Sequence, residues 1–212
     1  MPELNEEFFK EPISANNILE KINLLQKFNP TSGTFVHFTN LSDLKEIAQE
    51  DPTIVSDSLN RLFMGEELLC ERIENMIKEL RKIKKDAKIG TPLFGYFLAM
   101  YDYNKFPLYK DSIFQSLKKN IVKEMEWKSY TLGMKYQRFQ ELCLKMGEYL
   151  KNSNLLSDVE VNGIKIPVGI TALDGQDFFF YLDQKYSLHN LNYTFLIIRH
   201  LDILILFSLR LD

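Results

Sequence analysis

One segment near the middle of the chain is apolar on nearly every side. Residues 93–101, with the sequence LFGYFLAMY, contain no charged side chain. A helix without a polar face has to be buried on all sides, so this segment predicts a central helix surrounded by other helices. Thr91 is predicted to cap it, with Pro92 in its first turn. The 212 residues are 45% hydrophobic, which is enough to build a large core around such a helix.

Most of the remaining chain shows apolar residues at helical spacing, separated by breaks at glycine or proline. Ser14 is predicted to cap the first of these helices, and Pro52 to begin the third. The Asn162-Gly163 pair between two alternating segments predicts a β-hairpin. We therefore predict a mainly α fold, a multi-helix bundle with at most a small β-hairpin. The expected helices cover residues 15–28, from 40 or 42 onward, 52–64, about 66–85, 93–101, from 111 or 112 onward, and 136–150.

The chain is expected to form a single helical domain over residues 1–185, followed by an apolar segment over residues 186–212. Charged residues interrupt that last segment, among them Arg199 and Asp202, so we do not expect it to span a membrane. Two alternatives are that it packs on the core or that it belongs with another module. If it is left exposed, it would favour self-association.

Charge is unevenly distributed along the chain. The net charge is −3. Residues 1–77 carry 6 Lys or Arg against 14 Asp or Glu, a balance of −8, whereas residues 78–123 carry 11 against 4, a balance of +7. Such a separation can orient a polyanionic partner. The alternative is that these are the ordinary solvated faces of helices.

The basic stretch contains a turn that could bind phosphate. In Lys88-Ile89-Gly90-Thr91-Pro92 the backbone amides at a helix start, together with the helix dipole, can hold a phosphate oxygen. Nearby lysines would add contacts to a nucleic-acid backbone. The alternative is that Gly90 and Pro92 only turn the chain between two core helices. The predicted nucleic-acid-binding residues are Lys88, Gly90, Thr91, Lys110, Lys118 and Lys119.

Catalytic patterns are missing from the sequence. It contains no phosphate-binding G-x-x-x-x-G-K-[ST] motif and no G-x-S-x-G. The three histidines and the two cysteines, Cys70 and Cys143, have no metal-ligand spacing. We therefore predict no catalytic residue, no metal site and no cofactor. Acidic residues in place of a signal peptide, together with unpaired cysteines, favour the cytoplasm.

Three stretches of the chain together resemble a known family. Residues 89–98 (IGTPLFGYFL) and 102–109 (DYNKFPLY) are followed much later by residues 173–182 (LDGQDFFFYL). This series is similar to the helical region that precedes the ATPase or GTPase module in McrB-like restriction subunits and related AAA+ defence proteins. The resemblance covers roughly residues 60–185. It implies a defence protein whose nucleotide-binding module is not found in this sequence.

The turn and the following Phe106-Pro107 connector also resemble the helix-hairpin-helix core of base-excision DNA glycosylases. This second resemblance implies a helix-hairpin-helix-like core within the bundle. Such enzymes use a catalytic Asp beyond the hairpin, and Asp111 is the acid near the corresponding place. No lysine stands where a lyase would need one.

The leading hypothesis is a non-catalytic, DNA- or partner-binding helical module of a restriction or defence system, without a nucleotide-driven motor. Its expected partners are DNA and an ATPase, GTPase or nuclease subunit. The first alternative is a structural or protein-interaction domain. The second is a divergent helix-hairpin-helix glycosylase.

Overall fold

The computed structural model describes residues 2–29, 36–120, 129–152, 159–161, 164–166 and 171–186. Within these ranges the chain is mainly helical, as predicted. The elements are α1 (Pro2–Phe9), α2 (Ile18–Phe28), α3 (Phe38–Glu50), α4 (Pro52–Met64), α5 (Leu69–Ile83), α6 (Thr91–Asp102), α7 (Asp111–Asn120), α8 (Leu132–Asn152), β1 (Val159–Val161), β2 (Ile164–Ile166) and α9 (Ala172–Tyr186).

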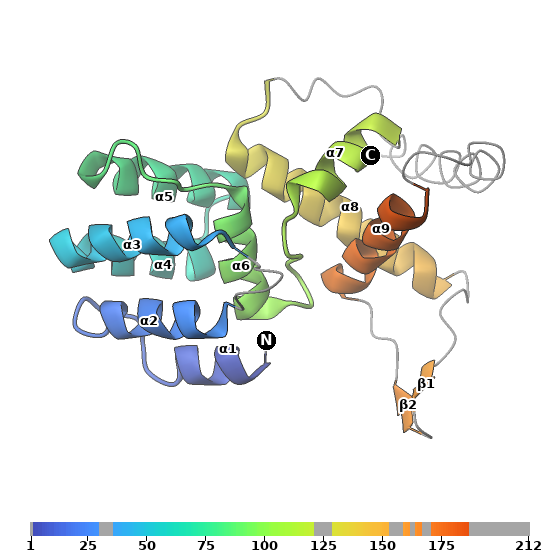
Figure 1. Cartoon of the computed structure of the whole chain (residues 1–212), viewed down its shortest axis with the longest axis horizontal. Helices are drawn as coiled ribbons and strands as arrows, with labels where there is room; N and C mark the ends of the chain where they lie inside the picture. Colours follow the sequence, from blue (N-terminus) through green and yellow to red (C-terminus); the bar gives the residue numbers. More distant parts are fainter. Residues whose placement is uncertain are drawn as a thin grey trace.

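The helices form two groups joined by α6. Helices α1 to α5 stack side by side, each against the next, and α6 runs across the end of this stack (Figure 1). On the other side of α6, α8 packs against α9 and also contacts α5, while α7 packs on α9. One continuous cluster of buried hydrophobic residues extends from Leu4 in α1 to Phe179 in α9. The bundle is therefore built around α6.

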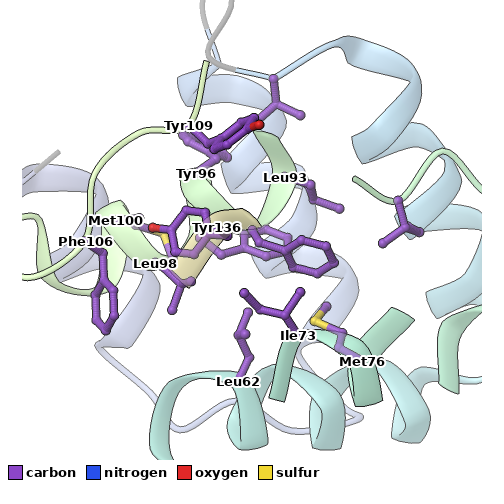
Figure 2. Packing of buried hydrophobic residues seen from close by; sticks show 14 of the residues in the cluster. Leu62, Ile73, Met76, Leu93, Tyr96, Leu98, Met100, Phe106, Tyr109 and Tyr136 are labelled. Carbon is purple, nitrogen blue, oxygen red and sulfur yellow. The ribbon is translucent and has the colours of Figure 1, made fainter. Parts of the chain in front are cut away.

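The burial of α6 confirms the central-helix prediction. Every residue from 93 to 100 is buried, and Figure 2 shows side chains of α6 among those of α4, α5 and α8. Buried tyrosines keep their hydroxyls satisfied, since Tyr136 donates to the Pro107 carbonyl at 2.9 Å and Tyr96 to the Leu25 carbonyl at 3.2 Å. Seven side chains of α6 and α7 in this core are at most 2% exposed: Leu93, Phe94, Phe97, Leu98, Ile113, Phe114 and Leu117.

Glycines allow three close contacts in this core. A Cβ on Gly95 of α6 would lie 2.6 Å from the backbone nitrogen of Tyr109, in the segment that leads to α7. Gly133 of α8 contacts the backbone of Cys70 in α5, and Gly175 of α9 contacts the backbone of Cys143 in α8. Any side chain at these positions would push the neighbouring backbone away.

Several helix boundaries differ from the prediction because of side-chain turns. α2 begins at Ile18 and not at residue 15, since Ser14 donates its amide to the Asn17 side chain at 3.0 Å in a preceding turn. α3 begins early, at Phe38, where the His37 ring accepts the Thr39 amide. α4 begins at Pro52 as predicted.

Helix α1 was not predicted at all. Its Asn5 donates to the carbonyls of Met100 and Tyr101, at 2.8 and 3.0 Å, and so satisfies the C-terminal end of α6. Its Phe8 is fully buried. The acidic start of the chain is therefore part of the core assembly.

The predicted β-hairpin is confirmed. β1 and β2 pair antiparallel, with Val161 opposite Ile164. The predicted apolar segment over residues 186–212 lies outside the described residues, apart from Tyr186 at the end of α9. Across the described ranges, no helix is both long enough and apolar enough to cross a membrane.

Candidate nucleic-acid interface

The basic turn between α5 and α6 is anchored to α3 by Asp43. Lys84 Nζ lies 2.6 Å from Asp43 Oδ1 and 2.6 Å from Glu46 Oε2. The Lys88 amide donates to the other Asp43 oxygen at 2.5 Å. Burial opposes ionisation of Asp43. The hydrogen bonds from Lys84 and from the Lys88 amide, together with the positive charges of the two lysine side chains, nevertheless bring the pKa of Asp43 below its ordinary value. Asp43 is therefore ionised at neutral pH and holds the turn in place.

Gly90, not Thr91, occupies the cap position of α6, which corrects the prediction. Gly90 has extended backbone (φ −145°, ψ 175°), and Thr91 is the first residue of the helix. No side chain caps the helix start. Thr91 is buried in the first turn of the helix, where it is only 5% exposed. The extended φ and the open space around Gly90, where a Cβ would meet only Pro92 at 3.7 Å, show that the turn does not require glycine.

Two backbone amides at this helix start have no described acceptor, and one of them, that of Gly90, belongs to a residue that lines a surface pocket. The Leu93 amide donates to the Gly90 carbonyl at 3.0 Å, and Pro92 has no amide hydrogen. The amides of Gly90 and Thr91 have no hydrogen-bond acceptor within the described part of the chain. Such amides, at the positive end of the helix dipole, favour an anion.

A shallow pocket of about 600 Å³ lies beside these amides. We call it the turn pocket; it is lined by Asn40, Arg81, Lys85, Asp86, Ala87, Lys88, Ile89, Gly90 and Pro92. Arg81, Lys85 and Lys88 are exposed, and none has an ion-pair partner among the described carboxylates. Asp86 is the acid in the lining, so the lining side chains carry a balance of three positive charges against one negative charge.

The structure unites only part of the predicted set. Lys88 and Gly90 line the turn pocket. Lys110 contacts α9 instead, with its ammonium 5.0 Å from the centre of the Phe180 ring. Lys118 and Lys119 belong to the last turn of α7, and their side chains lie outside the described atoms.

Sequence reasoning missed two kinds of site residue. Arg81 and Lys85 are absent from the predicted set, because a count of basic residues does not distinguish cations with an ion-pair partner from cations without one. Asn40 comes from the first turn of α3, and no local pattern connects it to the turn. Two residues before Asn40, Phe38 is 67% exposed, with its ring centre 4.6 Å from that of His37. An exposed aromatic side chain therefore begins the helix that supplies Asn40 to the turn pocket.

The residues considered as catalytic or metal-binding candidates lie on different helices. Asp111 is exposed at the start of α7 and accepts a hydrogen bond from the Tyr109 hydroxyl at 3.3 Å. Burial, with the Asp111 charge, raises the pKa of that hydroxyl. Cys143 is a fully buried thiol whose pKa is raised by burial, whereas Cys70 is partly exposed. No group of three His, Cys, Asp or Glu side chains in the described ranges could hold a metal ion.

Comparison of the chain with protein-family models, with curated proteins and with solved structures found no match.

Proposed function

We propose that this chain is a non-catalytic module that binds the phosphate backbone of DNA through the turn pocket. The observation that carries the proposal is the convergence of three exposed, unpaired cations, Arg81, Lys85 and Lys88, on a pocket that is also lined by Gly90, whose amide has no described acceptor. Cations and helix-start amides are the groups that proteins use for phosphate. Because Asp43 fixes the turn, the amides are held in position before any ligand arrives.

Contacts of this kind carry no base identity, so binding is independent of sequence. Three cations and the Gly90 amide can contact only a few phosphates, which gives weak affinity, roughly micromolar or worse at physiological salt. The exposed ring of Phe38 offers a surface on which an unpaired base can stack. Single-stranded DNA is therefore expected to bind at least as well as a duplex.

The biological setting in this proposal rests on the resemblance of residues 60–185 to McrB-like proteins. In such a system the module positions DNA in the cytoplasm, and an ATPase, GTPase or nuclease subunit supplies the chemistry. Lys118 and Lys119 of α7 remain DNA contacts predicted from the sequence. Changing both to Glu should weaken binding to unrelated DNA sequences by the same factor.

The direct test compares two variants with the same change of charge. Lys85→Gln with Lys88→Gln removes two cations of the turn pocket. Lys10→Gln with Lys151→Gln removes two exposed lysines outside it. Fluorescence anisotropy with labelled DNA at low salt should show a dissociation constant raised about tenfold or more by the first pair only, because fewer phosphates are then neutralised. Equal effects of both pairs, or no binding by the unmodified chain, would favour the protein-interaction alternative.

A further inference from the structure

A second pocket lies at the opposite end of α5, where it meets the start of α8. It has a volume of about 410 Å³ and is lined by Cys70, Glu71, Glu74, Asn75, Thr131 and Met134. We call it the α5–α8 pocket. Its two helices are in close contact there, because Gly133 packs on the Cys70 backbone and Gln137 Oε1 accepts the Cys70 amide at 3.1 Å. The walls of the pocket are thus fixed by the packing of the bundle.

Large apolar side chains are exposed around this pocket. Met134, in its wall, is 40% exposed, and Leu68, which precedes α5, is 62% exposed. They belong to the small set of large hydrophobic side chains exposed among the described residues. Together with the partly exposed Cys70 thiol they give the pocket an apolar surface. Exposed apolar surface that is gathered around a depression marks a binding site for another apolar group.

The charged groups at the pocket are acidic and have no cation partner. Glu71 accepts the Leu68 amide at 3.3 Å, and Glu74 accepts the Gly133 amide at 2.6 Å. Neither carboxylate forms an ion pair with a described Lys or Arg. Arg72 points elsewhere, because its guanidinium donates to the carbonyls of Leu62 and Phe63. The pocket therefore combines an apolar surface with two unneutralised carboxylates.

We propose that the α5–α8 pocket binds a basic amphipathic segment of a partner protein. An aliphatic side chain of that segment enters the pocket beside Met134 and Leu68, and Lys or Arg residues flanking it pair with Glu71 and Glu74. Charge complementarity selects this occupant, since an acidic or neutral segment would leave both carboxylates unpaired. The site is separate from the turn pocket, which lies at the other end of α5 and has the opposite charge.

Cys70 provides a local reporter for the test. The chain has two cysteines, and Cys143 is completely buried, so alkylation of the folded full chain reports on Cys70 alone. The probes are three short synthetic helices: one with leucine on one face and lysine on both flanks, one with glutamate replacing lysine, and one with serine replacing leucine. The first probe should slow alkylation of Cys70 by about tenfold at saturation, and the other two should leave its rate unchanged.

A matched pair of variants tests the role of the two carboxylate charges while the hydrogen bonds that support the fold are kept. Glu71→Gln with Glu74→Gln removes both charges, while each amide oxygen still accepts the backbone amide that the carboxylate accepted. Glu6→Gln with Glu7→Gln removes two exposed carboxylates of α1 and is the control. The first pair should raise the dissociation constant of the lysine probe about three- to tenfold, the range for two exposed ion pairs, and the control should not change it.

Three results would overturn the proposal. One is protection of Cys70 by the glutamate probe as strong as by the lysine probe. Another is unchanged affinity in the Glu71→Gln, Glu74→Gln variant. The third is an alkylation rate of Cys70 that falls as the protein concentration rises without any probe, because a second copy of the chain would then occupy the pocket. Alkylation of Cys143 serves as the control for unfolding in every arm.

Discussion

The backbone amide of Lys88 donates a hydrogen bond to the carboxylate of Asp43, 2.5 Å away, and this bond joins the basic turn to helix α3. The same carboxylate accepts Lys84 Nζ at 2.6 Å. Asp43 thus forms an ion pair with Lys84 and a hydrogen bond with the backbone of Lys88. Lys88 keeps its own ammonium for the turn pocket, and the amides at the start of α6 are held where a phosphate could meet them.

Replacement of Asp43 by Asn should destabilise the fold. The Asp43 side chain is only 13% exposed, and an amide cannot accept both bonds with the strength of a carboxylate. The free energy of unfolding in urea should fall by about 1.5–3 kcal/mol, the usual range for hydrogen bonds to a charged group. Glu46→Gln is the control, because Glu46 binds the same lysine but is 60% exposed. An equal decrease in both variants would mean that Asp43 has no special anchoring role.

The Asp43 contribution should also depend on pH in one direction. Its pKa in the folded chain lies below the ordinary value of 3.8, so the stabilisation is complete above that value and is lost as the pH falls through the folded pKa. The difference in unfolding free energy between the wild-type chain and Asp43→Asn should therefore be constant near neutral pH and shrink below pH 3.8. A difference that stays constant down to acid unfolding would contradict this.

Gly95 in α6 and Gly90 at its N-cap should respond differently to replacement by alanine. At Gly95 the new Cβ would lie 2.6 Å from the Tyr109 nitrogen, and the overlap should cost about 1–3 kcal/mol or more. At Gly90 the nearest atom is 3.7 Å away, so the change should stay below about 1 kcal/mol, because a poorer cap offsets the lower entropy of the unfolded chain. Urea unfolding of both variants gives the comparison. Similar destabilisation at the two positions would show that the α6–Tyr109 packing is not tight.

The purified full chain should not hydrolyse ATP or GTP. The phosphate-binding lysine motif of nucleotide-hydrolysing modules is missing from the sequence. Phosphate release should equal that of a mock purification from cells without the gene. Turnover that survives further purification and follows the protein peak would require a different nucleotide site.

The sequence and the structure agree best where local apolar periodicity decides the outcome. The all-round apolar character of residues 93–101 can only be satisfied at the centre of a bundle, and the structure places α6 there. Contacts between distant parts of the chain leave no such pattern. Asn5 satisfies carbonyls of α6 from 95 residues away, and Asp43 holds Lys88 from 45 residues away. For this reason α1 and the anchoring of the turn could not be predicted.

At the candidate site, the roles of charged residues also could not be predicted from the sequence. The sequence shows a surplus of lysines between residues 78 and 123, but lysines with the same local pattern have different roles in the structure. Lys84 forms ion pairs with α3, whereas its neighbour Lys85 has no described carboxylate partner and lines the turn pocket. Lys110 lies over an aromatic ring of α9. Which cations remain available to a ligand depends on tertiary contacts that composition cannot reveal.

The salt dependence of DNA binding tests the central proposal most directly. If Arg81, Lys85 and Lys88 each neutralise a phosphate, the logarithm of the binding constant should fall with the logarithm of salt concentration with a slope of about three. Removing Lys85 and Lys88 should lower that slope by about two, equally for two unrelated DNA sequences. A slope that stays the same in the Lys85→Gln, Lys88→Gln variant, with binding intact, would show that the turn pocket does not contact DNA.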